Sequence, residues 1–180
     1  MKKFIGMALA LIFFLAGGLR AEEPAGLFPV KQNGKWGFMD RTGKLVISPQ
    51  YELAGRFSEG LAPVQIGWRW GYVGKSGKVI IKPQFDSAYW FTQGLACVGK
   101  KQGDSYLSPT QYGYIDKTGK FVIYPKFVVA FPFSQGLAAV RTESGFGFID
   151  PTGKMVLEPH FASASSFSEG MAMVKIEGLA

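Results

Sequence analysis

The chain is built from one segment that occurs four times in tandem. Each copy opens with a short apolar segment, continues through an aromatic–glycine pair and ends on Phe-Ser-Glu-Gly or a close variant. Successive aromatic–glycine pairs are 34, 42 and 34 residues apart. A period of this size is the signature of repeat proteins, in which each copy packs mainly on its neighbours. The units are 27–60, 61–94, 95–136 and 137–170, and residues 171–180 begin a fifth.

The residues within each copy predict β-strands joined by tight turns. Short segments rich in β-branched and aromatic residues are separated by turn signals, a pattern that disfavours helix throughout. Asn33-Gly34 is a two-residue hairpin signal, and residues 40–43 (Asp-Arg-Thr-Gly) fit a type I turn followed by a left-handed glycine. We expect each unit to form a three-stranded antiparallel meander, followed by a loop or short helical turn.

The expected fold class is therefore all-β, with tandem three-stranded meanders forming an elongated or curved repeat array. A closed, propeller-like ring is the alternative, in which residues 171–176 would pair with the first unit. In an open array the same residues would cap the fourth unit. A gene product shortened within its fifth unit is also compatible with this pattern.

The four copies closely resemble the WG-repeat family of bacterial proteins. The resemblance covers essentially everything from Leu27 onward, except that the third unit carries eight extra residues around 101–110. It implies a repeat-built interaction or binding module. The aromatic–glycine pairs that carry it are Trp36-Gly37, Trp70-Gly71, Tyr112-Gly113 and Phe146-Gly147.

The aromatic–glycine pairs favour a structural role. Neighbouring side chains in a strand point to opposite faces, so the ring can fill a core while the glycine admits a neighbouring backbone on the other face. Variation among Trp, Tyr and Phe suits volume filling. An exposed row of these rings, acting as sugar-stacking platforms, is the competing interpretation.

The N-terminus predicts export. Lys2 and Lys3 precede an apolar run and then small residues, the pattern of a signal peptide. We place the signal peptide at 1–21, a linker at 22–26 and the repeat domain at 27–180, with cleavage after Gly18 as the alternative. A membrane anchor is the competing interpretation, but the apolar run is shorter than the roughly 20 residues of a spanning helix. The expected location is the periplasm or the cell exterior, with no stable membrane span after cleavage.

The charge and the cysteine count exclude several classes of partner. Removing residues 1–21 takes away three bases and no acid, which lowers the formal net charge from +7 to +4. The remaining lysines are scattered over turns, without the dense basic stripe that binds a phosphate backbone, so no nucleic acid is expected. Cys97 is the only cysteine, which rules out an intramolecular disulfide and a cysteine-rich metal site. We expect no cofactor and no metal.

The repetition also favours structural roles for the aspartate, histidine and cysteine residues that could otherwise be catalytic. Asp40, Asp116 and Asp150 occupy equivalent turns of different units, so we expect them to lie a repeat apart as turn formers. The single histidine, His160, stands where other units have glutamine or lysine. Cys97 stands where the fourth unit has alanine, which favours a small buried group. A nucleophilic cysteine–histidine pair is the alternative, and we expect no enzymatic activity.

The expected function is non-enzymatic binding of a protein or peptide partner in the periplasm or outside the cell. The extra residues of the third unit lie between its first two strands and predict a long exposed hairpin tip. That tip carries Lys100, Lys101 and Tyr106, a composition typical of binding surfaces. A cell-wall or carbohydrate-binding module that uses exposed aromatic rings is the alternative function.

Overall fold

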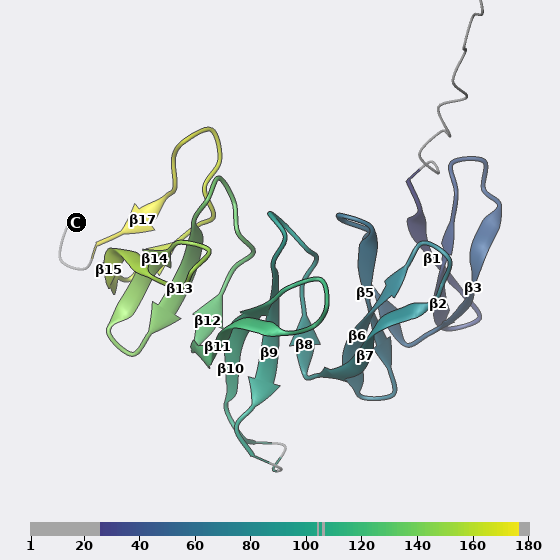
Figure 1. The fold of residues 1–180 in the computed structure, drawn as a ribbon, viewed down its shortest axis with the longest axis horizontal. Coiled ribbons are helices and arrows are strands. Elements are labelled where there is room, and N and C mark those ends of the chain that lie inside the picture. The colour runs from purple at the N-terminus through teal and green to yellow at the C-terminus, as the bar shows by residue number, and fades with distance from the viewer. Residues whose placement is uncertain (1–25, 104, 106, 177–180) are drawn as a thin grey trace, which may run out of the picture.

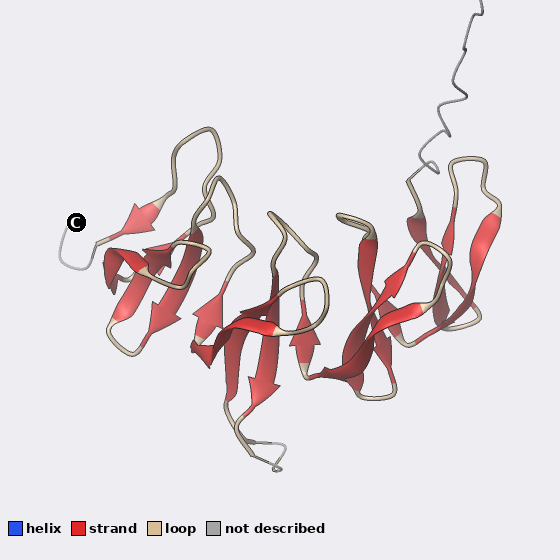
Figure 2. Ribbon diagram, viewed as in Figure 1, coloured by secondary structure: helices blue, strands red, loops and turns tan. Residues whose placement is uncertain are grey.

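Strands and turns make up the whole of the described chain. The computed structural model describes residues 26–103, 105 and 107–176, and this part contains no helix (Figure 2). The strands form small antiparallel sheets that follow one another in chain order (Figure 1). The tandem all-β array predicted from the sequence is confirmed, whereas the predicted signal peptide lies outside the described residues.

Each unit contributes the three long strands that the sequence predicts, joined as antiparallel hairpins. The first strands are β1 (Phe28–Gln32), β5 (Leu61–Ile66), β9 (Ala96–Lys101) and β13 (Ala138–Thr142). The second strands are β2 (Lys35–Met39), β6 (Arg69–Gly74), β10 (Thr110–Ile115) and β14 (Gly145–Ile149). The third strands are β3 (Leu45–Tyr51), β7 (Val79–Phe85), β11 (Phe121–Phe127) and β15 (Met155–Phe161).

The sequence predicted only a loop or short helical turn between each third strand and the Phe-Ser-Glu-Gly end. Residues 55–57 and their equivalents form this loop, but the prediction missed a strand at its start. A two-residue strand lies there, and it pairs with the first strand of the following unit, as Leu53 with Gln65 and Ala54 with Val64. The pairing satisfies backbone groups at the free edge of the next sheet, which would otherwise depend on solvent. The second, third and fourth sheets therefore have four strands each. The short strands are β4 (Leu53–Ala54), β8 (Ser87–Ala88), β12 (Val129–Ala130) and β16 (Ser163–Ala164).

The array is open, so the closed-ring alternative is wrong. The last strand, β17 (Val174–Lys175), pairs with β16 and not with the first unit. Figure 1 shows the sheets following one another along a curved path, with β1 and β17 at its two ends. The segment that begins a fifth unit therefore covers the edge of the fourth unit's short strand, as expected for an open array.

The first strand of each inner sheet buries both faces. In β5, Leu61 packs with Tyr72 in the core of the second unit, whereas Ala62 and Val64 pack with Phe38 in the core of the first. The strand period of two sends alternate side chains to opposite faces. Each core is therefore built from two consecutive units, and no inner unit has a hydrophobic core of its own.

The turn that ends each unit also touches the next unit. Ser58 and Leu61 exchange two backbone hydrogen bonds around Glu59 and Gly60, which both have positive φ angles of 50° and 87°. The Glu59 carboxylate accepts a hydrogen bond from the backbone N–H of Gly94, the corresponding glycine of the second unit, at 3.1 Å. Gln93 and Gln135 repeat this contact along the array, accepting from the N–H groups of Gly136 and Gly170.

The two turn types predicted within the units are confirmed. Asn33 and Gly34 have φ angles of 51° and 79°, as a type I′ hairpin turn requires. In the second turn, Asp40 Oδ1 accepts hydrogen bonds from the N–H of Thr42 at 2.9 Å and of Lys44 at 3.1 Å. The hydroxyl of Thr42 donates to the same oxygen and is the main cause that lowers the pKa of Asp40.

The glycine of each aromatic–glycine pair lies beneath a bulge of the neighbouring third strand. In the second unit, Trp70 pairs with Phe85 and Tyr72 with Ile81, so the register shifts between them and β7 bends over Gly71. A Cβ atom on Gly71 would lie 2.8 Å from the backbone nitrogen of Pro83. Only glycine fits at this position, which confirms the predicted close approach of a neighbouring backbone.

Gly71→Ala is expected to lower the free energy of unfolding by about 1–3 kcal/mol, the range for overpacking a rigid core. Gly74→Ala is the matched control, because the nearest atom to a Cβ there is in the Ile80 side chain, at an ordinary contact distance of 3.5 Å. We expect that control to change stability by less than about 0.5 kcal/mol. Urea unfolding followed by tryptophan fluorescence measures both variants, and equal stabilities would contradict the packing of β7 over Gly71.

Candidate functional site

The aromatic rings of the aromatic–glycine pairs are half-buried. All four pack against the hydrophobic cores, and each exposes less of its surface than the Trp68 ring at a hairpin tip. They therefore contribute to the cores, as the favoured interpretation predicted, and do not form the exposed row that sugar stacking requires. The four rings are Trp36, Trp70, Tyr112 and Phe146.

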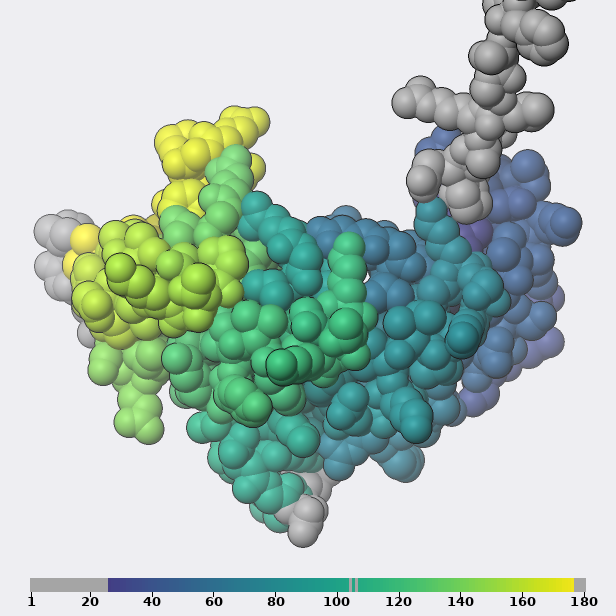
Figure 3. All heavy atoms as spheres, in the orientation of Figure 1, coloured from purple at the N-terminus to yellow at the C-terminus, as the bar shows by residue number. Residues whose placement is uncertain are grey.

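The predicted binding residues lie on the long hairpin of the third unit. Strands β9 and β10 continue to the pair Lys101 and Thr110, and the extra residues form the tip beyond that pair. Figure 3 shows this hairpin projecting from the lower side of the array. Lys100 is exposed and Lys101 is half-buried, whereas Tyr106 lies outside the described residues. Leu107, on the same tip, exposes 88% of its surface.

The neighbouring hairpin carries an exposed residue that the sequence reasoning missed. Trp68 lies at the tip between β5 and β6 and exposes 91% of its surface. The aromatic–glycine pair Trp70-Gly71 follows two residues later, and the repeat pattern indicated a role for that pair and none for Trp68. The signal was present in Gly67-Trp68, because a turn pair between two apolar strands places its side chains at a hairpin tip.

A carboxylate fixes these two hairpins side by side. Asp86, which follows β7, receives a hydrogen bond from Arg69 Nη1 at 2.6 Å and another from the backbone N–H of Lys101 at 2.9 Å. Arg69 belongs to the hairpin of the second unit and Lys101 to that of the third. We name Trp68, Lys100, Lys101 and Leu107 together the tip surface.

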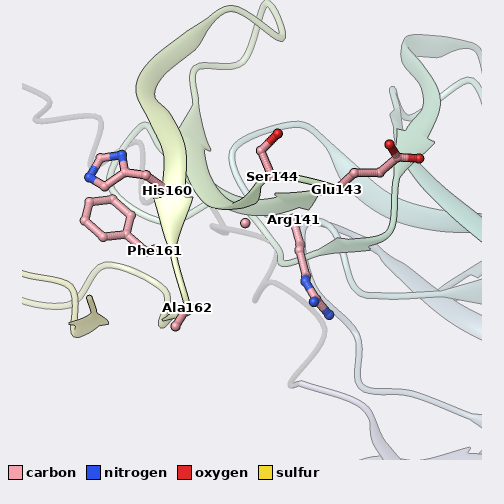
Figure 4. A pocket seen from close by; sticks show the side chains of 7 residues that line it. Arg141, Glu143, Ser144, His160, Phe161 and Ala162 are labelled. Carbon is pink, nitrogen blue, oxygen red and sulfur yellow. The ribbon is translucent and has the colours of Figure 1, made fainter. Parts of the chain in front are cut away.

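A polar hollow of about 220 Å³ lies in the fourth unit, between the β13–β14 hairpin and β15. Figure 4 shows that the side chains of Arg141, Glu143 and His160 point in different directions from its wall. His160 Nδ1 lies 2.8 Å from the carbonyl oxygen of Glu158, and its ring packs on Phe161 at 4.0 Å between centroids. The hollow therefore offers a polar surface without side chains that converge on one point.

The cysteine and the histidine lie in different units. Cys97 is fully buried in β9, where its thiol is 3.5 Å from the carbonyl oxygen of Ala130, whereas His160 is exposed on β15. Burial raises the pKa of the Cys97 thiol well above its usual value, which disfavours the reactive thiolate. The structure therefore does not bring this candidate nucleophilic pair together.

The three turn aspartates are also separate, as predicted. Asp116 and Asp150 each accept hydrogen bonds from the threonine and lysine of their own turn, in the same way as Asp40. Across residues 26–176, excluding 104 and 106, no cluster of three or more His, Cys, Asp or Glu side chains could hold a metal ion. The same residues include no helix that could cross a membrane.

The family of the chain follows from these repeats. The model of the WG containing repeat matches residues 36–67, 70–102, 112–144 and 146–179, which together make up more than half of the chain. The chain therefore belongs to the WG-repeat family. Comparison with curated proteins and with solved structures gave no match.

The burial of Cys97 predicts a thiol that is unreactive in the folded protein. We expect a chromogenic disulfide reagent to react with the Cys97 thiol only as fast as the native protein unfolds globally. In denaturant the reaction should be immediate. We expect Cys97→Ala to lower the free energy of unfolding by about 1 kcal/mol, because few atoms are removed and the fourth unit has Ala139 here. Rapid labelling of the native protein would contradict the buried position.

Proposed function

We propose that this protein is a non-enzymatic, exported binding module that recognises a protein or peptide partner through its tip surface. The observation that carries the proposal is the placement of the two most exposed large apolar side chains of the described residues, Trp68 and Leu107. Both lie at tips of consecutive hairpins. Exposed tryptophan in this setting is typical of binding anchors, because its large ring is desolvated when a partner covers it.

The rigidity of the hairpins supports this proposal. Asp86 fixes the relative position of the second and third hairpins, and Glu52 does the same for the first and second. Glu52 pairs with Lys35 at 2.9 Å and accepts a hydrogen bond from the N–H of Gly67 at 3.2 Å. The tip of the second hairpin and the base of the third are therefore held in place before a partner binds, which reduces the entropy lost on binding.

The neighbouring charges suit a partner with acidic residues around an apolar anchor site. Lys100 is exposed beside the long tip, and the sequence places Tyr106 on the same tip. The carbohydrate-binding alternative requires exposed aromatic rings. The half-buried rings of the aromatic–glycine pairs do not supply them, so on this alternative the stacking ring would be Trp68. Export rests on the N-terminal sequence, and fractionation of cells that express the full chain tests it.

The test of the proposed site combines two variants. Replacing residues 102–109 with Asn-Gly shortens the third hairpin to a two-residue turn, and Trp68→Ala removes the anchor ring. Recovery of partners from envelope extract, followed by titration of each purified partner, should show an affinity loss of about 30-fold, the size expected at a binding hot spot.

A matched control replaces Glu143-Ser144, the tip of the fourth hairpin, with Asn-Gly. That tip has no large apolar side chain, so we expect the control to retain its partners. If both tip-surface variants fold and bind every partner as tightly as the original protein, the tip surface is not the binding site.

A further inference from the structure

A second surface lies along the third strands. In the second, third and fourth sheets, β7, β11 and β15 form the edge opposite the short strand, and β3 forms one edge of the first sheet. One β-branched residue at the same position of each unit exposes nearly half of its surface. These residues are Val46 (46%), Ile80 (47%), Val122 (46%) and Val156 (50%).

The two middle strands combine this aliphatic row with positive charge. Exposed residues alternate with buried ones, so that Ile80 and Lys82 face outward while Ile81 is buried. Residues 78–84 contain two lysines and no acid, and residues 120–126 do likewise. The corresponding residues 44–50 contain one lysine, and residues 154–160 contain one lysine and one glutamate. Positive charge is therefore concentrated on the second and third units.

A packing contact through the buried Ile81 side chain holds the two strands next to each other in consecutive units. The turn that leads into β11 lies over β7, since a Cβ atom on Gly119 would be 2.9 Å from Ile81 Cγ2. Tyr124 is 73% exposed and stacks on Phe121, with the ring centroids 5.5 Å apart. Figure 1 shows β7 and β11 in consecutive sheets of the array. We name this surface the basic edge: Lys78, Ile80, Lys82, Lys120, Val122, Tyr124 and Lys126.

We propose that the basic edge binds an extended polypeptide segment in which acidic and aliphatic residues alternate. Exposed lysines complement carboxylates, and the aliphatic row between them provides apolar area that such a segment can cover. An aliphatic residue recurs at the same exposed position of every unit, and such a recurring position in a repeat protein suits an elongated ligand.

A flat anionic bilayer fits this surface less well than a peptide does. The aliphatic side chains are only half exposed on their strands, whereas the two most exposed apolar side chains, Trp68 and Leu107, lie at hairpin tips. Lys78 and Lys120 also lie at the start of the third strands, whereas the hairpin tips lie beside the ends of these strands, since Phe85 pairs with Trp70 and Phe127 with Tyr112. This proposal is therefore independent of the one made for the tip surface.

The experiment measures fluorescence anisotropy of a fluorescein-labelled peptide of alternating glutamate and valine, titrated with the full repeat domain. Lys78→Glu combined with Lys120→Glu should weaken binding about tenfold or more, because two attractive charges become repulsive. Lys44→Glu combined with Lys154→Glu is the matched control. It makes the same charge change at the same turn position in the outer units, and we expect a loss below about threefold.

A second pair of variants tests the aliphatic row. Val122→Thr replaces a methyl group with a hydroxyl, and Ile80→Thr replaces an ethyl group with a hydroxyl. Both variants remain β-branched, and each should weaken binding about threefold or more, because apolar area is lost from the contact. Polyglutamate without valine should bind more weakly than the alternating peptide. Thermal unfolding checks that every variant is folded.

Three outcomes would overturn the proposal. The first is an absence of measurable binding by the folded protein. The second is equal weakening by the inner and outer charge reversals, which would indicate general attraction to a basic protein. The third is binding to vesicles of phosphatidylglycerol but not to the peptide, with the same dependence on Lys78 and Lys120, which would assign the surface to a membrane.

Discussion

The backbone pairing between the short strand of one unit and the first strand of the next is the constraint on which the molecule depends. Gly55 donates to the carbonyl oxygen of Pro63, and Tyr89 and Phe131 donate in the same way to Cys97 and Ala139. This pairing carries the chain from one sheet to the next and holds the faces of consecutive sheets together. The inner units therefore obtain their fourth strand from the unit before and complete their core with residues of the unit after, so stability is expected to be shared among neighbours.

Sharing of the cores restricts the inward positions to apolar residues that fill similar volumes, as Trp36, Tyr112 and Phe146 do. The inward positions of each unit must match those of its neighbours, whereas the hairpin tips and the outward faces of the third strands are free to differ. The tips differ in Trp68 and in the long third hairpin, and the outward faces differ in charge between the middle and outer units. The two surfaces proposed for binding are thus the places where the repeats depart from one another.

The long strands and their turns could be predicted because their signals are local. Asn33-Gly34 specifies its turn through positive φ angles, and the oxygen of Asp40 specifies the next through hydrogen bonds. The two-residue strands could not be predicted, because Leu53 and Ala54 are too few to show a period and their partners lie in another unit. The candidate site could be predicted only in part, for a similar reason. The sequence assigned Lys100 and Lys101 to a long hairpin, but the position of this hairpin beside that of the second unit depends on the tertiary contact through Asp86.

Amide hydrogen exchange at the joints between units tests the central claim most directly. The amides of Gly55, Tyr89 and Phe131 should exchange as slowly as strand amides in the same sheets, because each is bonded to the next unit and opens only when that contact breaks. If these three amides instead exchange at the rate of an open loop while the strand amides stay protected, the units are not joined by their short strands and the account is contradicted.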